Sequence, residues 1–288
     1  AYVAVTRPGI AVRRLGRAVR AMRLAARGLR GVGLVVATLF GGAMAAGSAN
    51  ALTCYYDRDI DAIMMRTKNR PLNDSLVSPR SALVFGLVLG VLSLTSLWLT
   101  TNALSAGLAA AAIAFYVLVY TRLLKRRTAQ NIVWGGAAGC MPVLIGWTAV
   151  TGRLAWAPVV LFLIVFLWTP PHFWALAMQF RSDYAAARVP MLPVVATAEV
   201  VTARIVVYSW AMVAASLLLW PVARTGPVYA VAAAGLGAVF LREAYALKRR
   251  VRQGRPAQSG RLFHLSISYL SVLFLLVAVE NLVPLAWR

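Results

Sequence analysis

The stretch GVGLVVATLFGGAMAAGSANALTCYYDRDID, residues 31–61, decides the architecture of this chain. It is an apolar run long enough to cross a bilayer, for which about 20 residues are needed, and it ends in Asp57, Asp59 and Asp61. The whole chain of 288 residues has only eight acidic residues, so three within five positions form a cluster. Carboxylates at the end of an apolar helix are costly unless a cation meets them, and we therefore expect the functional site here.

Composition places the chain among membrane proteins. Hydrophobic residues make up 61%, charged residues 13%, and the mean hydropathy is +0.73, values that disfavour a soluble globular domain. The net charge of +22 suggests nucleic acid at first, but Lys and Arg fall in short clusters between apolar runs, as in membrane loops. We expect no nucleic-acid partner. Cys54 and Cys140 are too few for a disulfide framework or a Cys/His metal cluster.

The expected fold is all-α, a polytopic membrane helix bundle of about nine helices, made of eight clear spans and an Arg-rich N-terminal helix. Residues 1–31 would form the N-terminal segment and 32–288 the bundle. The apolar runs predict spans near 32–52, 81–100, 103–120, 131–150, 157–178, 203–221, 227–245 and 265–286.

The distribution of Lys and Arg predicts the orientation. The connections 57–80, 122–127, 179–204 and 242–261 hold 5, 4, 3 and 7 of them, whereas the alternate connections and the C-terminus hold only Arg153, Arg224 and Arg288. By the positive-inside rule the first group is cytoplasmic. We therefore expect a multi-pass protein of the cell membrane with its active-site loops in the cytoplasm.

Residues 10–30 carry seven arginines, and here two rules conflict. An odd number of spans would restore the positive-inside rule, but an arginine costs about 2.5–3.5 kcal/mol near a bilayer centre. The alternatives are an interfacial amphipathic helix and an unusual first span. We predict an interfacial helix, with Val12, Leu15, Val19 and Met22 inward and the arginines mostly on the other face.

The acidic cluster suits a divalent cation and a phosphate. On a continuing helix Asp57 and Asp61 share one face, with Asn50 and Thr53 stacked above them. Two carboxylates one turn apart suit Mg²⁺, which keeps several waters and bridges to substrate phosphate. Downstream, Arg66, Lys68 and Arg70 can bind phosphate oxygens. The alternative is that the aspartates are solvated helix-cap residues.

Five motifs together resemble protoheme IX farnesyltransferases (haem O synthases), a family of the UbiA-type intramembrane prenyltransferase superfamily. They are DRDID (57–61), RTKNRPL (66–72), YTRLLKRRTAQN (120–131), WTPPHFWALA (168–177) and DYAAARVPMLP (183–193). The resemblance covers about residues 32–285. It implies a nine-helix bundle with a cytoplasm-facing cavity, in which farnesyl is transferred from farnesyl diphosphate to a vinyl group of haem B, giving haem O.

The resemblance also implies roles for individual residues. Asp57, Asp61 and Asp183 would be catalytic and would hold Mg²⁺. The substrate-binding candidates are Asn50, Thr53, Arg66, Arg70, Tyr120, Lys125, Arg126, Arg127, Asn131 and His172. Lys125, Arg126 and Arg127 could instead be topogenic charges only. His172 could contact haem, or it could be a hydrogen-bonded packing residue.

Three positions depart from the family pattern. Thr53 stands where the pattern has Asn, Ser182 where it usually has a second acidic residue, and Arg188 where it usually has a small residue. A hydroxyl offers no amide carbonyl to a metal, so Mg²⁺ affinity could be lower. A weakened or non-catalytic homologue therefore remains open.

Other functions remain open beside farnesyl transfer to haem. The chain could be a UbiA-type prenyltransferase with an aromatic or quinone-type acceptor, or a non-catalytic transporter or assembly partner of oxidase biogenesis. Convergence of Asp57, Asp61 and Asp183 within metal-bridging distance in one cavity would favour an enzyme, and divergence to bulk solvent would not. Besides farnesyl diphosphate, haem B and the lipid bilayer, a downstream haem A synthase is an expected partner.

Overall fold

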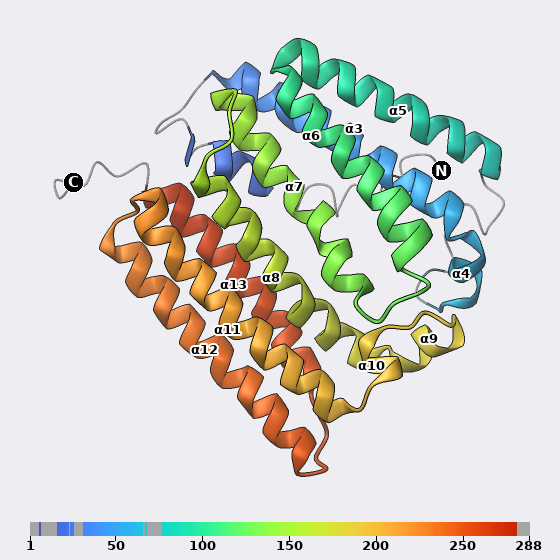
Figure 1. The fold of residues 1–288 in the computed structure, drawn as a ribbon, viewed down its shortest axis with the longest axis vertical. Helices are drawn as coiled ribbons and strands as arrows, with labels where there is room; N and C mark the ends of the chain where they lie inside the picture. The colour runs from blue at the N-terminus through green and yellow to red at the C-terminus, as the bar shows by residue number, and fades with distance from the viewer. Residues whose placement is uncertain are drawn as a thin grey trace.

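The computed structural model describes Thr6 and residues 16–22, 24–25, 31–65, 67 and 77–280, and this part of the chain is helical with connecting turns (Figure 1). Its long helices are α3 (Val32–Tyr56), α5 (Pro79–Thr100), α6 (Ala103–Ala114) continued by the π-helix η1 (Phe115–Leu124), α7 (Asn131–Thr151), α8 (Trp156–Gln179), α11 (Ala198–Ala223), α12 (Pro227–Arg252) and α13 (Ser259–Glu280). Three short helices connect them, α4 (Arg58–Ile63), α9 (Arg181–Ala186) and α10 (Leu192–Val195).

Eight helices of the described chain are long and apolar enough to cross a membrane, which confirms the eight expected spans. Several ends differ from the expectation. α12 runs to Arg252 rather than 245, because Lys and Arg are good helix formers and the helix continues past its apolar part. α13 begins at Ser259 rather than 265, directly after Gln258, whose φ of 52° closes the preceding turn.

The helices form two groups joined through α7 and α8. α3 packs on α5 and α6, α7 packs on α6 and α8, and α8 also packs on α11 and α13. Figure 1 shows α3, α5 and α6 on one side and α11, α12 and α13 on the other. Small polar side chains hold α3 and α5 close together. Ser48 Oγ donates to Gly86 O and Ser93 Oγ donates to Gly41 O, each at 2.7 Å. Such contacts are typical of helices packed within a bilayer.

The described part of the N-terminal segment lies against α7. Ala18, Ala21 and Met22 are buried, and a Cβ at Gly146 would overlap the Ala18 carbonyl. Met22 therefore faces inward as expected and Val19 is half-buried, whereas Val12 and Leu15 lie outside the described residues. Whether residues 10–30 cross the bilayer stays a prediction.

One arginine of this segment differs from the expectation of a shared outward face. Arg17 Nη1 donates to Gly139 O at 3.3 Å, and its guanidinium lies 5.9 Å from the centre of the Trp168 ring. A carbonyl and an aromatic face are both favourable neighbours for a guanidinium, which explains the inward orientation.

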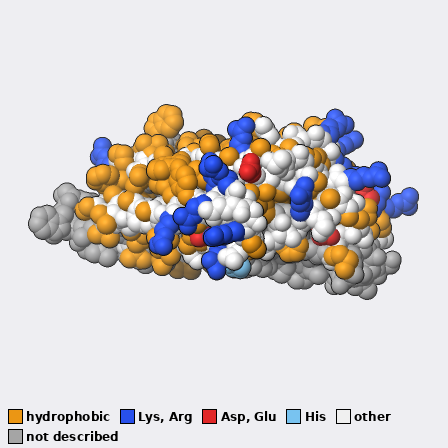
Figure 2. All heavy atoms as spheres, turned by 90° about the horizontal axis from the view of Figure 1, so that it is seen from below, with side chains coloured by type: hydrophobic (Ala, Val, Ile, Leu, Met, Phe, Trp, Pro, Cys, Tyr) orange, Lys and Arg blue, Asp and Glu red, His pale blue; other side chains and the backbone are white. Residues whose placement is uncertain are grey.

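The described parts of the four connections rich in Lys and Arg lie toward one end of the bundle, along the right and lower right of Figure 1, where α4, α9, α10 and the turn from α12 to α13 are found. Figure 2 views this end and shows basic side chains spread over it among hydrophobic ones. We call it the basic end. The Lys- and Arg-rich connections, on which the predicted orientation depends, therefore lie on one side of the bundle.

Candidate functional site

The site is built at the corner between α3 and α4, at the basic end. Asp57 ends α3 and precedes α4, its backbone N–H donates to Thr53 O at 2.9 Å, and Asp61 N donates to Asp57 O at 2.8 Å. The near-continuous helix puts both carboxylates on the buried side, with relative exposures of 0% for Asp57 and 3% for Asp61. The alternative of solvated cap residues is therefore wrong for these two. It fits Asp59, whose side chain is 59% exposed.

Lys125 is the cation that meets Asp57. Its Nζ forms an ion pair with Asp57 Oδ2, and Arg126 Nη2 lies 3.9 Å from Asp57 Oδ1. Lys125 follows η1, whose wide turns are closed by bonds between residues five apart, such as Lys125 N to Tyr120 O at 2.8 Å. π-helical turns are frequent at functional sites, and here the turn carries the ammonium group to the acidic corner.

Arg126 forms an ion pair with the exposed Asp59. Its Nη1 and Nη2 each donate to one oxygen of Asp59 at 2.7 Å, and Nη2 also donates to Tyr56 O at 2.9 Å. These hydrogen bonds hold the pKa of Asp59 below its usual range and raise the pKa of Arg126. The guanidinium of Arg126 thus joins α4 to the turn after η1, and its expected role in binding substrate stays a prediction. The reason for this pairing is geometric, since a planar fork matches a carboxylate bidentately.

Asn131, at the start of α7, lies beside the same corner. It is fully buried, and its Nδ2 donates to Lys125 O at 3.2 Å, so it fixes the backbone that carries Lys125. Tyr120 stacks on Tyr116 with ring centres 5.2 Å apart and lies over Gly135, where a Cβ would overlap its ring. Arg127 is exposed.

Asp183 reaches the acidic corner from α9. Its Oδ1 accepts a hydrogen bond from Met65 N at 2.8 Å. Met65 lies two residues beyond α4, so this bond links the motif that begins at Asp183 to the segment that follows Asp57–Asp61. Ser182, the departure from the family pattern, is exposed.

The oxygens left over fit a hard cation. Among the described residues, Asp57 Oδ1, Asn131 Oδ1 and Asp183 Oδ2 are buried without a hydrogen-bond partner, and oxygen ligands are those that Mg²⁺ prefers. No three His, Cys, Asp or Glu side chains within the described ranges lie close enough to hold one ion. A metal here would need further oxygens from substrate and water, as Mg²⁺ commonly does. The assignment of Asp57, Asp61 and Asp183 as ligands stays a prediction.

Two other expected residues are already bonded. Asn50 is buried and its Nδ2 donates to Thr6 O at 3.0 Å. Thr53 Oγ1 lies 3.3 Å from Thr121 Oγ1, which links α3 to η1 one turn from Asp57. Arg66 and Arg70 lie outside the described residues.

His172 lies away from the acidic corner in an aromatic stack. Its ring lies 4.1 Å from that of Trp168 and 4.6 Å from that of Phe263, and its Nδ1 is 2.7 Å from Ser266 Oγ. These contacts join α8 to α13 and favour the alternative of a hydrogen-bonded packing residue.

An apolar cavity lies on the helices that form the corner. Its volume is about 60 Å³, and it is lined by Ala18, Thr38, Gly42, Ala45, Ala46, Ala49, Ala112, Ile113, Tyr116, Ala138, Met141, Pro142 and Ile145. Ala45 and Ala49 stand four residues apart on the stripe of α3 that continues to Thr53 and Asp57. The charged corner thus lies at the end of an apolar, small-residue wall.

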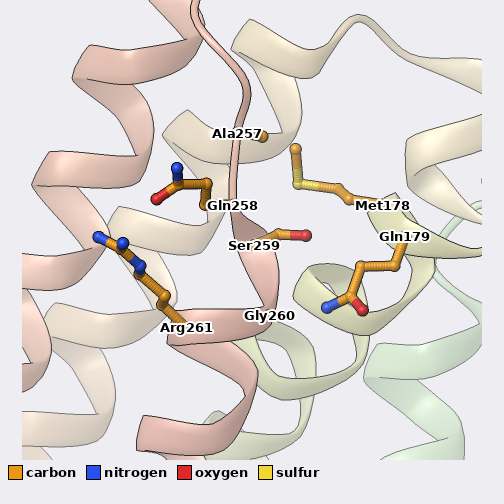
Figure 3. Close-up of a pocket in the computed structure, with 7 residues that line it drawn as sticks. All are labelled: Met178, Gln179, Ala257, Gln258, Ser259, Gly260 and Arg261. Carbon is orange, nitrogen blue, oxygen red and sulfur yellow. The ribbon is translucent and has the colours of Figure 1, made fainter.

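A second cavity opens at the same end, between α8 and the start of α13. Figure 3 shows Met178 and Gln179 on one side and Gln258, Ser259 and Arg261 on the other, around a volume of about 490 Å³. It combines one cation and several hydrogen-bonding groups with a thioether. Sequence reasoning missed it, because Arg261 reads there as one more basic loop residue.

The fold and site define an intramembrane helical bundle that buries carboxylates and a cation at the end of an apolar cavity. A family model described as the UbiA prenyltransferase family matches residues 17–267, so the chain belongs to that family. It is 58% identical to a protoheme IX farnesyltransferase of Nocardioides sp. over 285 residues, 98% of this chain and 91% of that one. A protoheme IX farnesyltransferase of Frankia alni is 58% identical over 98% of each chain.

Solved structures share the fold. A digeranylgeranylglyceryl phosphate synthase matches with a TM-score of 0.81 at 15% identity, covering 97% of each chain. A UbiA homolog from Archaeoglobus fulgidus bound to DMAPP and Mg²⁺ matches with a TM-score of 0.70 at 14% identity, covering 96% of this chain and 99% of that one. The expected superfamily and bundle architecture are therefore confirmed.

Proposed function

We propose that this protein transfers a farnesyl group from farnesyl diphosphate to a vinyl group of haem B, forming haem O. The carrying observation is the ion pair of buried Asp57 with Lys125, beside buried Asp61, at the end of an apolar wall on the same helices. A substrate with an anionic head and an apolar tail matches this arrangement. The relatives named protoheme IX farnesyltransferase support the choice of donor and acceptor.

The charged corner would act on the diphosphate. Ionising an allylic diphosphate requires neutralisation of charge on the leaving group. Lys125 is held in place by Asp57 and by Asn131, and it would supply one positive charge there. Arg66 and Arg70 would add two more. Mg²⁺ at the carboxylates of Asp57 and Asp61, with the rest of its coordination completed by substrate and water, would supply further neutralisation of the leaving oxygens.

The apolar wall would receive the farnesyl chain. The cavity of about 60 Å³ between Ala45, Ala49 and Tyr116 is smaller than a farnesyl chain, so these helices would have to move apart on binding. An allylic cation is stabilised by aromatic faces and must be kept from water until the vinyl carbon attacks. Diphosphate is the leaving group, and water then adds to the cation formed from the vinyl group and supplies the hydroxyl of haem O. Tyr116, which is stacked on Tyr120, would present an aromatic face here.

Location and partners belong to the same proposal. The basic end would face the cytoplasm of a cell-membrane protein, where both diphosphate and haem B are supplied. Its apolar product would stay in the bilayer. An enzyme of the membrane that consumes haem O, such as haem A synthase, would then be its partner.

The test is product formation by the purified protein. We expect that incubation with haem B, farnesyl diphosphate and Mg²⁺ gives a haem whose mass is raised by one farnesyl group and a hydroxyl, and that chelation of the metal stops it. The same reaction with a quinone precursor in place of haem B examines the alternative acceptor. Prenylation of the quinone precursor but not of haem would overturn the proposal, and no product with either would indicate a non-catalytic homologue.

A further inference from the structure

The outer face of α12 changes character along its length. Positions 228, 231, 235, 238, 242, 245, 249 and 252 follow one face of the helix at spacings of three and four residues. The face is apolar up to Val239 and then presents Arg242, Tyr245, Arg249 and Arg252, all exposed. The opposite face, with Tyr229, Phe240 and Leu247, is buried in the bundle. α12 therefore turns a basic patch outward at the edge of the bundle (Figure 1).

The patch carries cations that no described carboxylate neutralises. Arg242, Lys248, Arg249 and Arg252 line a cavity of about 970 Å³ with Tyr245 and Gln253. Glu243 also lines the cavity, but its Oε1 is bound by Arg250 Nη2 at 2.6 Å. Four positive charges thus border one hollow, and the acidic residue beside them is already paired. An anion of complementary charge would stabilise this arrangement.

The patch lies at the depth of lipid headgroups. Trp210 Nε1 donates to Tyr245 Oη at 3.0 Å, and both side chains are exposed on the outside of the bundle. Tyr and Trp gather where the hydrocarbon of a bilayer meets its headgroups. Ala238 and Val239 are exposed on α12 on the apolar side of this pair, about 10 Å along the helix, within the roughly 15 Å of one leaflet where acyl chains would lie. The four cations stand on the other side, where phosphates would lie.

We propose that this cavity of α12 binds the headgroup of an anionic phospholipid, with Arg242, Arg249 and Arg252 around the phosphate and the acyl chains along Ala238 and Val239. Basic pockets beside membrane helices bind anionic headgroups in this way. The site is separate from the acidic corner and independent of the reaction proposed above.

The test compares lipids and variants on the full-length protein in a nonionic detergent, with bound lipid counted by native mass spectrometry. Phosphatidylglycerol and phosphatidylcholine with identical acyl chains are titrated separately. We expect preferential retention of phosphatidylglycerol, and a loss of about 25-fold in its affinity in the double variant Arg249→Gln/Arg252→Gln, since each basic residue near an anionic surface contributes roughly a fivefold factor.

The matched control is Arg80→Gln/Arg122→Gln, which removes the same charge from exposed positions of α5 and η1, outside the cavity and on helices that do not pack on α12. Its affinity for phosphatidylglycerol should stay within about twofold of the parent, because headgroup contacts fall off within a Debye length. An equal loss in both double variants would mean a general charge effect and would overturn the proposal. Equal binding of the two lipids, or displacement of phosphatidylglycerol by millimolar inorganic phosphate, would overturn it as well.

Discussion

Asp57 and Asp59 stand two residues apart and offer a sharp test of the site. Asp57→Asn and Asp59→Asn remove the same charge with little change of shape, but Asp57 is fully buried against Lys125 and Asp59 is 59% exposed. Loss of an electrostatic group inside an active site costs roughly 10²–10³ in rate. We expect a loss of that order for Asp57→Asn and a change within about threefold for Asp59→Asn, because exposed ion pairs contribute only about 0.2–1 kcal/mol.

The stability of the Asp57→Asn protein needs its own control. Breaking a buried pair costs roughly 3–5 kcal/mol, and the 19% exposure of the Lys125 side chain places the expected cost near the lower limit. The double variant Asp57→Leu/Lys125→Met replaces both charges with apolar groups, and an apolar replacement of a buried pair is often neutral. It should recover most of the stability but none of the activity.

The assay is haem O formed per folded protein, measured by chromatography, with folded protein quantified by size exclusion. Equal losses of activity in Asp57→Asn and Asp59→Asn would refute the distinction between a catalytic, buried Asp57 and an exposed Asp59 that only pairs with Arg126. Recovery of activity in the double variant would show that Asp57 serves stability alone.

Four further predictions follow from single contacts. Gly135→Ala should cost roughly 1–3 kcal/mol and lower activity, because its methyl group would displace the Tyr120 ring, whereas Gly139→Ala meets no atom within 4 Å and should be neutral in thermal unfolding and activity assays. Arg188→Gly should raise stability by about 1 kcal/mol, because Arg188 has a φ of 52° and left-handed backbone costs a non-glycine residue roughly that much; a lower midpoint of thermal unfolding would contradict this. Because its folded-state pKa is depressed, Asp59 stabilises the protein above its unfolded pKa and loses that effect as pH falls through the folded value. The difference in unfolding midpoint between the parent and Asp59→Asn should therefore be constant from about pH 5 to 8, shrink as the pH falls below about 4, and vanish only below the depressed folded-state pKa. Thr53→Asn should lower the Mg²⁺ concentration for half-maximal activity by supplying an amide oxygen beside Asp57; an unchanged Mg²⁺ titration would show that the Thr53–Thr121 contact is no defect.

The membrane spans could be predicted from sequence because a bilayer imposes a length and an apolar character on each of them. The common face of Asp57 and Asp61 could also be predicted, because four-residue spacing fixes it on a helix. Both features depend on local sequence alone. The π-helical turn at Phe115–Leu124 left no such signal, and it carries Lys125 to the corner.

The pairing of Arg126 with Asp59 could not be predicted, because the two residues are 67 positions apart in the chain. In the sequence, Arg126 is one of three consecutive basic residues, and Asp59 does not share the helix face of Asp57 and Asp61. The structure separates the three: Lys125 meets the buried carboxylate, Arg126 meets the exposed one, and Arg127 is exposed. The conformation of the backbone turn after η1 therefore determines which of the three consecutive basic residues faces inward.

The N-terminal segment shows packing and charge acting against each other. Its small residues favour burial, since Ala18 and Ala21 fit against α7 where Gly146 leaves room. Its arginines oppose burial unless each finds a partner. Arg17 finds the Gly139 carbonyl and the face of Trp168, both of which are polar or polarisable groups already present in the bundle. Carbonyl and aromatic partners can therefore replace the scarce carboxylates of this chain, and the number of such partners limits how many arginines the bundle can accept.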